Sequence, residues 1–304
     1  MTDSQIQSIL KLQISQEGTT YNGLEVYHYT ETKNIQKILQ TDKVSLRMTR
    51  VEDFEDEHEG RKTIEMFYDL SLERLLRNGI ICQSSFEQMS KIELPRTTMF
   101  FWNDHKRKVT HYRAREYYTY IFCFSLKEND PHMIESYIKN EGHNGYCLSF
   151  YTENLGENQT TLALFDRQVR IQLSRVLYGE EVVDSLYRYL QNLVSILGNN
   201  DPHSLGKWGV PIIKEELSRM RYLVKRYRYS KENEVRLILM FPKYTKKKLL
   251  EKSQKLLFSK EENKQYVYLD VPKDVFAGMK KTMGVTDEED SSIRDLLRKR
   301  EYTV

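Results

Sequence analysis

Apolar and polar residues alternate in several short runs of this chain, a pattern typical of β-strands that are buried on one face. The run Leu24-Glu25-Val26-Tyr27-His28-Tyr29 places Leu24, Val26 and His28 on one face and the other three residues on the opposite one. Residues 234–241 are almost continuously apolar, which predicts a central strand that ends at Pro242. Further strands are predicted at residues 44–48, 117–126, 146–150, 169–178 and 266–271.

Helical periodicity separates many of these strands. One helix is predicted through Ile35 and Leu39, with Thr30 or Thr32 available as its N-cap. Further helical segments are predicted at residues 61–78, 133–138, 180–197 and 211–225, a short amphipathic segment at residues 249–258, and a terminal helical region from Pro272 onward. Because strands and helices mix without regular βαβ alternation, the pattern favours an α+β fold over a doubly wound sheet.

At 304 residues, the chain is long enough for one large domain or two modest ones. We expect a polar helical segment at residues 1–20, one domain at residues 21–275 and a charged helical tail at residues 276–304. The central domain is predicted to have a split, mainly antiparallel sheet with helical insertions.

Composition narrows the class of protein further. The net charge of +3 is too small to indicate a polyanion partner by itself. Three cysteines without CxxC spacing argue against a disulfide framework or a zinc site, and no metal is predicted. The N-terminus lacks a signal-peptide pattern, and no apolar stretch approaches about 18 residues. We therefore expect a cytoplasmic protein without a membrane partner.

Several common catalytic motifs are absent from the sequence. Neither GxxxxGK[ST] nor GxGxxG occurs, which removes the commonest phosphate-binding loops. Neither HExxH nor GxSxG occurs, which removes the main support for zinc proteases and α/β-hydrolases. Any nucleotide would have to be bound in another way.

The most informative polar pattern is Glu232-Asn233-Glu234, at the start of the apolar run. If the strand extends back through this triplet, both carboxylates face the same side. Burying them is costly unless they are paired or used. Arg236 offers an ion pair to either carboxylate. The alternative is a fixed anion at the edge of a dry pocket, which stabilises developing positive charge or positions a nucleophile.

Three further side chains are candidates for ligand contact. His28 ends a predicted strand just before a helix, although a histidine bonded to a nearby carbonyl is the alternative. Ser125 ends another strand, and Tyr137 lies on the short helix that follows. With 21 tyrosines in the chain, a structural role is the default for any one of them.

Two basic clusters, residues 106–115 and 219–228, interleave cations with aromatic residues, which would suit phosphates and stacked bases. A solvated helix face is the alternative for the second cluster. The candidate nucleic-acid-binding residues are Arg107, Arg113, Arg115, Arg221, Arg226 and Arg228. An acidic run also offers Asp53, Asp56 and Glu59 to a metal-dependent nuclease, but it lacks the regular spacing of a calcium loop.

Five short motifs together resemble a bacterial family known only as a domain of unknown function, over about residues 24–275. They are Tyr27-His28-Tyr29, Phe54-Glu55-Asp56-Glu57-His58-Glu59, Cys123-Phe124-Ser125 with Tyr137, Gly145-Tyr146-Cys147-Leu148-Ser149-Phe150, and Glu232-Asn233-Glu234-Val235-Arg236. The chain departs from that family at Glu55 and Glu57, where Asn and Pro are usual, and at Ile134, where Trp is common.

The same order of elements resembles the His-Tyr-Glu class of ADP-ribosyltransferases. That resemblance implies an ADP-ribosyltransferase-like fold and NAD as substrate. It implies that His28 bonds the nicotinamide ribose and that Tyr137 stacks on nicotinamide. Glu234 would stabilise the oxocarbenium and Glu232 would orient the acceptor. The other NAD-binding positions that it implies are Tyr29, Thr30 and Ser125.

The leading hypothesis is mono-ADP-ribosyl transfer by a bacterial toxin or phage-defence effector, onto RNA, DNA or protein, with a neutralising partner protein as a further expectation. The alternative hypothesis is a non-catalytic nucleic-acid-binding or interaction module of a defence system.

Overall fold

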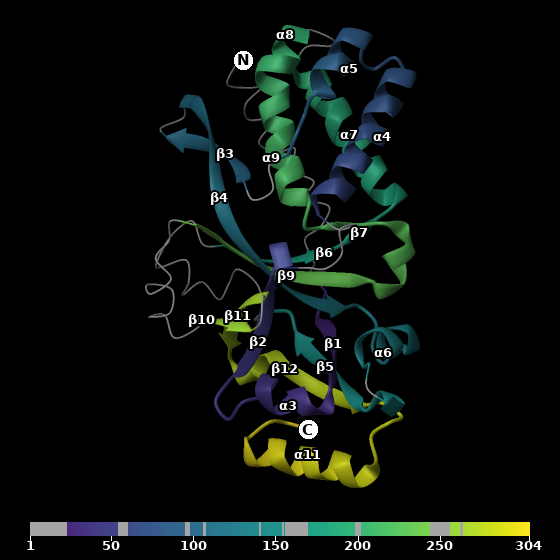
Figure 1. The fold of residues 1–304 in the computed structure, drawn as a ribbon, viewed down its shortest axis with the longest axis vertical. Helices are drawn as coiled ribbons and strands as arrows, with labels where there is room; N and C mark the ends of the chain where they lie inside the picture. The colour runs from purple at the N-terminus through teal and green to yellow at the C-terminus, as the bar shows by residue number, and fades with distance from the viewer. Residues whose placement is uncertain are drawn as a thin grey trace. The chain divides into compact units, whose positions relative to one another are not determined.

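The computed structural model (Figure 1) describes most of the chain. The described residues are 23–53, 60–94, 98–105, 108–139, 141–153, 155, 170–197, 202–243, 256–261 and 264–304.

The chain folds into two compact units, where the sequence predicted one domain over residues 21–275. Unit 1 comprises residues 1–20, 56–117 and 176–230, and unit 2 comprises residues 21–55, 118–175 and 231–304. Each unit is therefore built from three separate stretches of sequence. Local periodicity cannot show this division, because the partition depends on contacts between distant segments.

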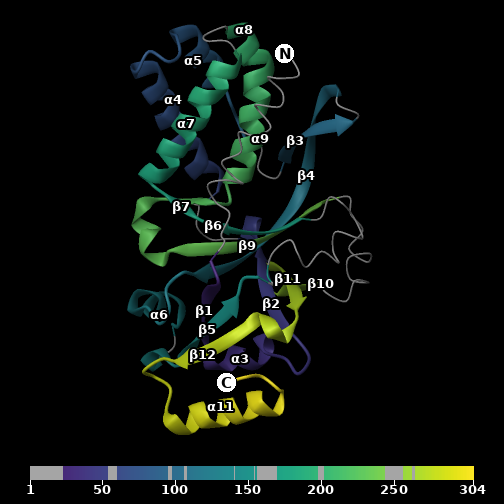
Figure 2. The same ribbon diagram turned by 180° about the vertical axis from the view of Figure 1, so that it is seen from behind.

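Unit 1 is mainly helical, and Figure 2 shows its helices side by side. Their apolar stripes form one core that includes Leu72, Leu186, Leu190 and Ile213. The helices are α4 (Arg61–Arg77), α5 (Gln83–Met89), α7 (Glu180–Leu197), α8 (Pro202–Ser204), the π-helical turn η4 (Leu205–Gly209) and α9 (Val210–Met220). Two short parallel strands, β7 (Leu177–Tyr178) and β8 (Val224–Lys225), pair here. Strand β3 (Thr98–His105) pairs with the first part of β4 (Lys108–Ser125).

Unit 2 is built on an antiparallel sheet with the strand order β10-β11-β2-β4-β1-β5-β12, in which β9 also pairs with β4 and β6. The mixed α+β class with an antiparallel sheet is thus confirmed. Its strands are β1 (Glu25–Glu31), β2 (Val44–Arg50), β5 (Gly145–Tyr151), β6 (Arg170–Arg175), β9 (Glu234–Pro242), β10 (Leu256–Glu261), β11 (Lys264–Val271), β12 (Phe276–Lys281) and the second half of β4. Its helices are α3 (Thr32–Ile38), α6 (Pro131–Tyr137) and α11 (Asp287–Lys299), with 3-10 turns η1 (Val51–Asp53), η2 (Glu141–His143) and η6 (Lys273–Val275).

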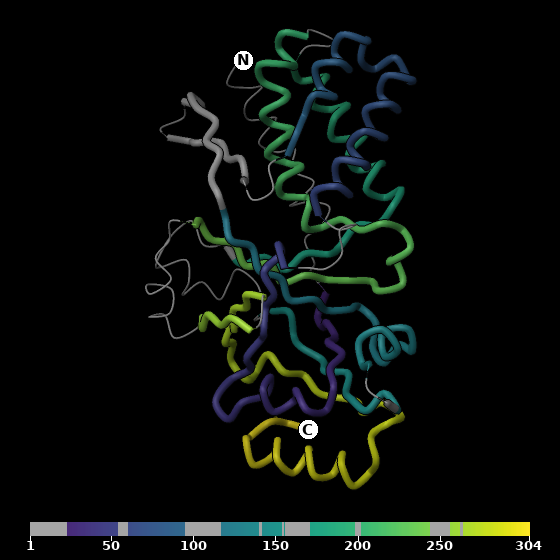
Figure 3. Tube along the Cα trace, in the orientation of Figure 1, coloured from purple at the N-terminus to yellow at the C-terminus, as the bar shows by residue number. Residues whose placement is uncertain are grey.

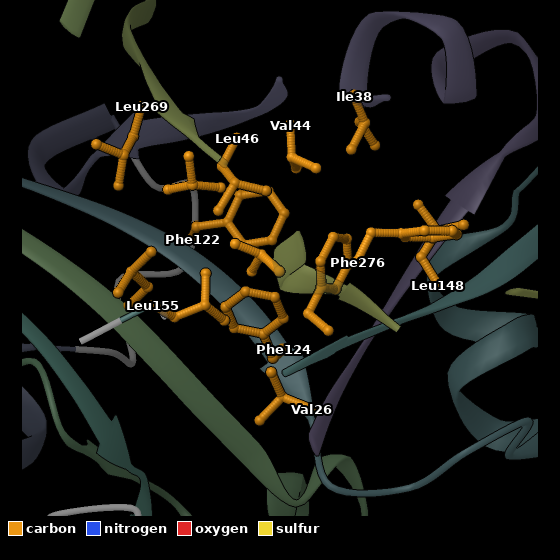
Figure 4. Packing of buried hydrophobic residues seen from close by; sticks show 14 of the residues in the cluster. Val26, Ile38, Val44, Leu46, Phe122, Phe124, Leu148, Leu155, Leu269 and Phe276 are labelled. Atoms are coloured by element: carbon orange, nitrogen blue, oxygen red, sulfur yellow. The ribbon is translucent and has the colours of Figure 1, made fainter. Parts of the chain in front are cut away.

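Aromatic and aliphatic side chains fill the core of unit 2 (Figure 4). Phe122 and Phe124 of β4 lie with ring centroids 4.9 Å apart, and Phe124 meets Phe150 of β5 edge-on. Edge-on and offset aromatic contacts of this kind add stability beyond the area that they bury. They pack β4 against β5 within the core of unit 2.

The predicted end of the chain differs from the structure. Pro272 precedes a single 3-10 turn and then β12, which pairs with β5, so residues 276–281 are part of the sheet rather than of a helical tail. The helix that follows, α11, is closed at its N-terminus by a capping box between Thr286 and Glu289.

The C-terminal end of the chain, yellow in Figure 3, runs close to the purple segment that contains α3, and side chains of its last residues hold this helix. Arg300 donates hydrogen bonds to the carbonyls of Gln36 and Leu39, at the end of α3 where carbonyls lack helical partners. The Tyr302 hydroxyl lies 2.8 Å from the carbonyls of both Gln40 and Lys43. The position of α3 therefore depends on the last residues of the sequence. The predicted N-caps Thr30 and Thr32 do not cap α3, whose N-cap residue is Glu31.

Candidate functional site

Strand β4 contacts β1 and β2 at different points along its length. Thr49 of β2 is opposite Ile121, whereas Tyr27 of β1 is opposite Ser125. Residues 122–124 lie between these two points, where the sheet opens. Because the opening has rigid strand walls, it is a suitable place for a small-molecule site.

A cavity of about 500 Å³ lies at this opening in unit 2. Its volume falls within the roughly 300–1,000 Å³ that is typical of small-molecule sites. The cavity is lined by residues of β1, α3, β2, β4 and α6, together with Glu234, Glu261 and Tyr268. His28, Tyr29, Thr30, Ser125, Tyr137 and Glu234 all line it, so the structure brings together six of the seven residues predicted for an NAD site.

His28 is fixed at the opening by the backbone of β4. Its Nδ1 lies 3.1 Å from the Cys123 carbonyl oxygen, and its ring lies 4.4 Å from that of Phe122. Because a carbonyl only accepts, Nδ1 carries the proton and Nε2 keeps its lone pair. Burial lowers the pKa of His28 to about 4, so the ring is neutral at physiological pH. The carbonyl bond that the sequence offered as an alternative is present, yet the ring also borders the cavity.

Glu234 is the first residue of β9 and is only 2% exposed. The Arg236 guanidinium reaches both of its carboxylate oxygens, at 2.8 Å from Nε and 3.2 Å from Nη2. The ion pair that the sequence offered as an alternative therefore exists. A carboxylate oxygen accepts more than one hydrogen bond, so a bidentate guanidinium orients the group without exhausting it.

Glu232 does not share a strand face with Glu234. Asn233 has a φ of +42°, in the left-handed region, and β9 begins only after it. The condition under which both carboxylates would face the same side, a strand that extends back through the triplet, is therefore not met. Asparagine is one of the few residues other than glycine that tolerate this conformation, because its short side chain forms local hydrogen bonds. The side chain of Glu232 is not among the residues that line the cavity.

Ser125 joins the end of β4 to the start of β9. Its hydroxyl donates to the Glu232 carbonyl at 2.8 Å and accepts from the Lys127 amide at 3.1 Å. The Leu126 amide also donates to the Asn233 carbonyl at 2.9 Å. These bonds set the point at which β9 starts, and so they place Glu234 at the cavity.

Tyr29 plays a similar supporting part for α6. Its hydroxyl donates to the Lys127 carbonyl at 2.6 Å and accepts from the Asp130 amide at 2.8 Å, and burial raises the pKa of this phenol. Asp130 in turn caps α6 by accepting from the Met133 amide. The helix ends with Tyr137, which is 40% exposed at the cavity. Thr30 is buried in the cavity wall.

One of the six candidate nucleic-acid-binding residues lies in the interior. Arg221 is 1% exposed and lies over the Tyr222 ring at 4.6 Å, so its predicted surface role is wrong. Arg226 is half-buried and Arg228 is exposed. Arg107 lies outside the described residues, and so do the side chains of Arg113 and Arg115. The segment of alternating cations and aromatic residues, 219–228, is thus partly buried. Within it, the Arg221 guanidinium packs on an aromatic ring instead of being exposed to water.

The acidic run gives little support to a metal-dependent nuclease. Asp53 uses one carboxylate oxygen for Arg50, at 2.8 Å, and the other for the Gln265 amide, at 2.6 Å. Asp56 and Glu59 lie outside the described residues. Among the described residues, no group of three or more histidine, cysteine or acidic side chains is arranged to hold a metal ion.

Several parts of the cavity wall were not predicted as parts of a site. Phe122, Phe124 and Arg47 lie in predicted strands, and Lys37 lies in a predicted helix, but none of them was a candidate site residue. Their joint position depends on how β2 and α3 approach β4, which no local pattern records.

The fold and the cavity define an α+β protein with a small-molecule-type site at an opening in an antiparallel sheet. No protein-family model matches the chain. Searches of curated proteins and of solved structures also gave no match. In the part of the chain that the structure describes, no helix is long and apolar enough to cross a bilayer.

Proposed function

We propose that this protein is a mono-ADP-ribosyltransferase that uses NAD as its substrate. One observation carries the proposal: His28 of β1, Tyr137 of α6 and Glu234 of β9 line one cavity although they lie far apart in the sequence. These three are the residues to which the resemblance to the His-Tyr-Glu class assigns NAD binding and catalysis.

The chemistry suits these side chains. In the reaction the bond between nicotinamide and ribose breaks, and nicotinamide leaves with the bonding electron pair. The ribose carbon becomes cationic, and an acceptor nucleophile attacks it and loses a proton. A preorganised carboxylate stabilises the cationic transition state, because it is oriented before the charge develops. Glu234 has this property, since Arg236 fixes both of its oxygens.

The other residues bind and orient the substrate. With Nδ1 committed to the Cys123 carbonyl, His28 presents Nε2 as an acceptor for a ribose hydroxyl. Tyr137 offers an accessible ring for stacking on nicotinamide. Ser125 and Tyr29 act as positioning residues for Glu234 and Tyr137, through the contacts described above. Glu232 keeps its proposed role in orienting the acceptor, without support from the cavity lining.

The sharpest test separates the catalytic role of the Glu234 carboxylate from its role in stabilising the fold through the ion pair with Arg236. Glu234→Gln is expected to abolish release of nicotinamide from labelled NAD, and also to destabilise the fold by roughly 3 kcal/mol, because it removes the carboxylate that pairs with the buried Arg236. The double variant Glu234→Gln, Arg236→Met also removes the buried guanidinium and is expected to recover stability in urea unfolding, but not activity.

Three results are informative. Recovery of nicotinamide release in the double variant would show that Glu234 acts only through folding. If the wild-type chain releases no nicotinamide, transfers no label to lysate and shows no thermal shift with NAD, the enzyme proposal fails. Salt-dependent nucleic-acid binding that survives Glu234→Gln would instead support the non-catalytic alternative.

A further inference from the structure

Each described carboxylate that lines the cavity has a cationic partner, whereas one lysine of the lining forms no ion pair with a described residue. The described residues that line it include three carboxylates, those of Glu31, Glu234 and Glu261. Each has a cationic partner: Lys33 at 2.5 Å, Arg236 at 2.8 Å and Arg47 at 3.3 Å, respectively.

Lys37 is the exception. It lines the cavity from the last turn of α3, its side chain is exposed, and it forms no ion pair with any described residue. The described wall therefore carries a positive charge that no protein carboxylate neutralises. Such a charge favours an anionic ligand.

Arg47 of β2 is a second cation of this wall, and its present partner is easily exchanged. Arg47 and Glu261 are about half exposed, at 50% and 49%, and ion pairs of that exposure are weak. Glu261 would keep a second hydrogen bond, because the Tyr268 hydroxyl donates to it at 3.3 Å. The guanidinium lies over the Tyr266 ring at 4.6 Å, which restricts its direction. A planar guanidinium of this kind suits bidentate phosphate recognition.

We propose that Lys37 and Arg47 form an anion subsite for the diphosphate of a dinucleotide substrate. The assignment rests on the proposed function, because the diphosphate of NAD is joined to the same ribose whose glycosidic bond breaks. The cations come from α3 and β2, whereas Glu234 comes from β9. The cavity thus offers cations to the phosphates and a separate anion to the developing ribose cation.

The experiment measures binding of ADP-ribose, which has the diphosphate but no nicotinamide, to the full chain by calorimetry. Lys37→Gln and Arg47→Gln are each expected to weaken binding about three- to tenfold, with a smaller effect at high salt. The matched control is Lys299→Gln, which removes the same charge from the exposed end of α11 and should leave the affinity unchanged. Adenosine, which has no phosphate, should bind the wild type and the three variants with equal affinity.

The outcomes separate this proposal from the proposed function. If ADP-ribose binds the wild type and Lys37→Gln equally well, the subsite is wrong. If inorganic pyrophosphate or a single-stranded oligonucleotide shows the Lys37 dependence and ADP-ribose does not, the dinucleotide assignment is wrong. If ADP-ribose binding depends on Lys37 while no nicotinamide is ever released from NAD, the subsite stands and the transferase proposal falls.

Discussion

His28 is held in its neutral form by its surroundings, which makes it a hydrogen-bonding group rather than a charge. Its position on β1 could be predicted from alternation, and so could its place next to a helix. Its tautomer could not, because the Cys123 carbonyl that selects it comes from a distant strand. Asn233 is similar: its residue type permits a positive φ, but only the bonds between β4 and β9 show that the backbone adopts one.

His28 should also contribute to the pH dependence of stability. Its pKa is about 4 in the folded protein against an ordinary value of 6.5, so the unfolded chain binds the proton more readily. Stability should therefore be lost as the pH falls from 6.5 toward 4. His28→Asn, whose amide nitrogen can still donate to the Cys123 carbonyl, should unfold in urea with a smaller change between pH 7 and pH 4.5 than the wild type. If the free energy of unfolding changed equally with pH in both proteins, His28 would not be a buried neutral histidine.

At the scale of elements, the strands and the longer helices were accessible from the sequence, because alternation and the 3.6-residue period are local. Strand β1, strand β11 and helix α7 were predicted almost to their ends. Strand β12 was missed because Phe276–Lys281 contains only two buried side chains, and its pairing with β5 decides its conformation. Several residues of the cavity were candidates from the sequence, but the cavity itself was not predicted. It exists only because β1 and β2 pair with β4 at different points along its length.

The link between β4 and β9 gives a test at this scale. Ser125→Ala removes a hydroxyl that serves both the Glu232 carbonyl and the Lys127 amide, so we expect a loss of about 1–3 kcal/mol in the free energy of unfolding. Because Glu234 follows this link, the rate of nicotinamide release should fall as well. Ser149→Ala on β5 is the matched control and should change neither quantity by much. A variant at Ser125 as stable and active as this control would show that the link is dispensable.

At the scale of the whole molecule, the last residues of the sequence support the first helix of the cavity. Arg300 and Tyr302 donate hydrogen bonds to the carbonyls of residues 39 and 40, at the end of α3, and α3 carries Lys37. The sequence predicted a charged tail here, because the partners of these side chains lie more than two hundred positions earlier. Long-range bonds of this kind leave no trace in local composition.

Tyr302→Phe tests this dependence. The change keeps the ring against Phe276 but leaves the Gln40 and Lys43 carbonyls without the hydroxyl, so we expect about 1–2 kcal/mol lower stability and weaker binding of ADP-ribose. Tyr151→Phe, at an exposed tyrosine of β5, is the matched control for loss of a hydroxyl and should leave both quantities unchanged. Unaltered affinity for ADP-ribose in Tyr302→Phe would show that α3 keeps its position without the hydrogen bonds of the Tyr302 hydroxyl.

The division of unit 2 into three sequence segments also has a consequence during synthesis. A ribosome adds about 5–20 residues per second, from the N-terminus, and domains fold as their segments become available. His28 belongs to the first segment, whereas Glu234 and the residues that hold α3 belong to the third. The nascent chain therefore carries an incomplete cavity until its final stretch has emerged. A fragment that stops within the third stretch of unit 1, residues 176–230, or earlier lacks Glu234 altogether. On the proposed function, such a fragment should be inert toward NAD even where its strands have begun to pair.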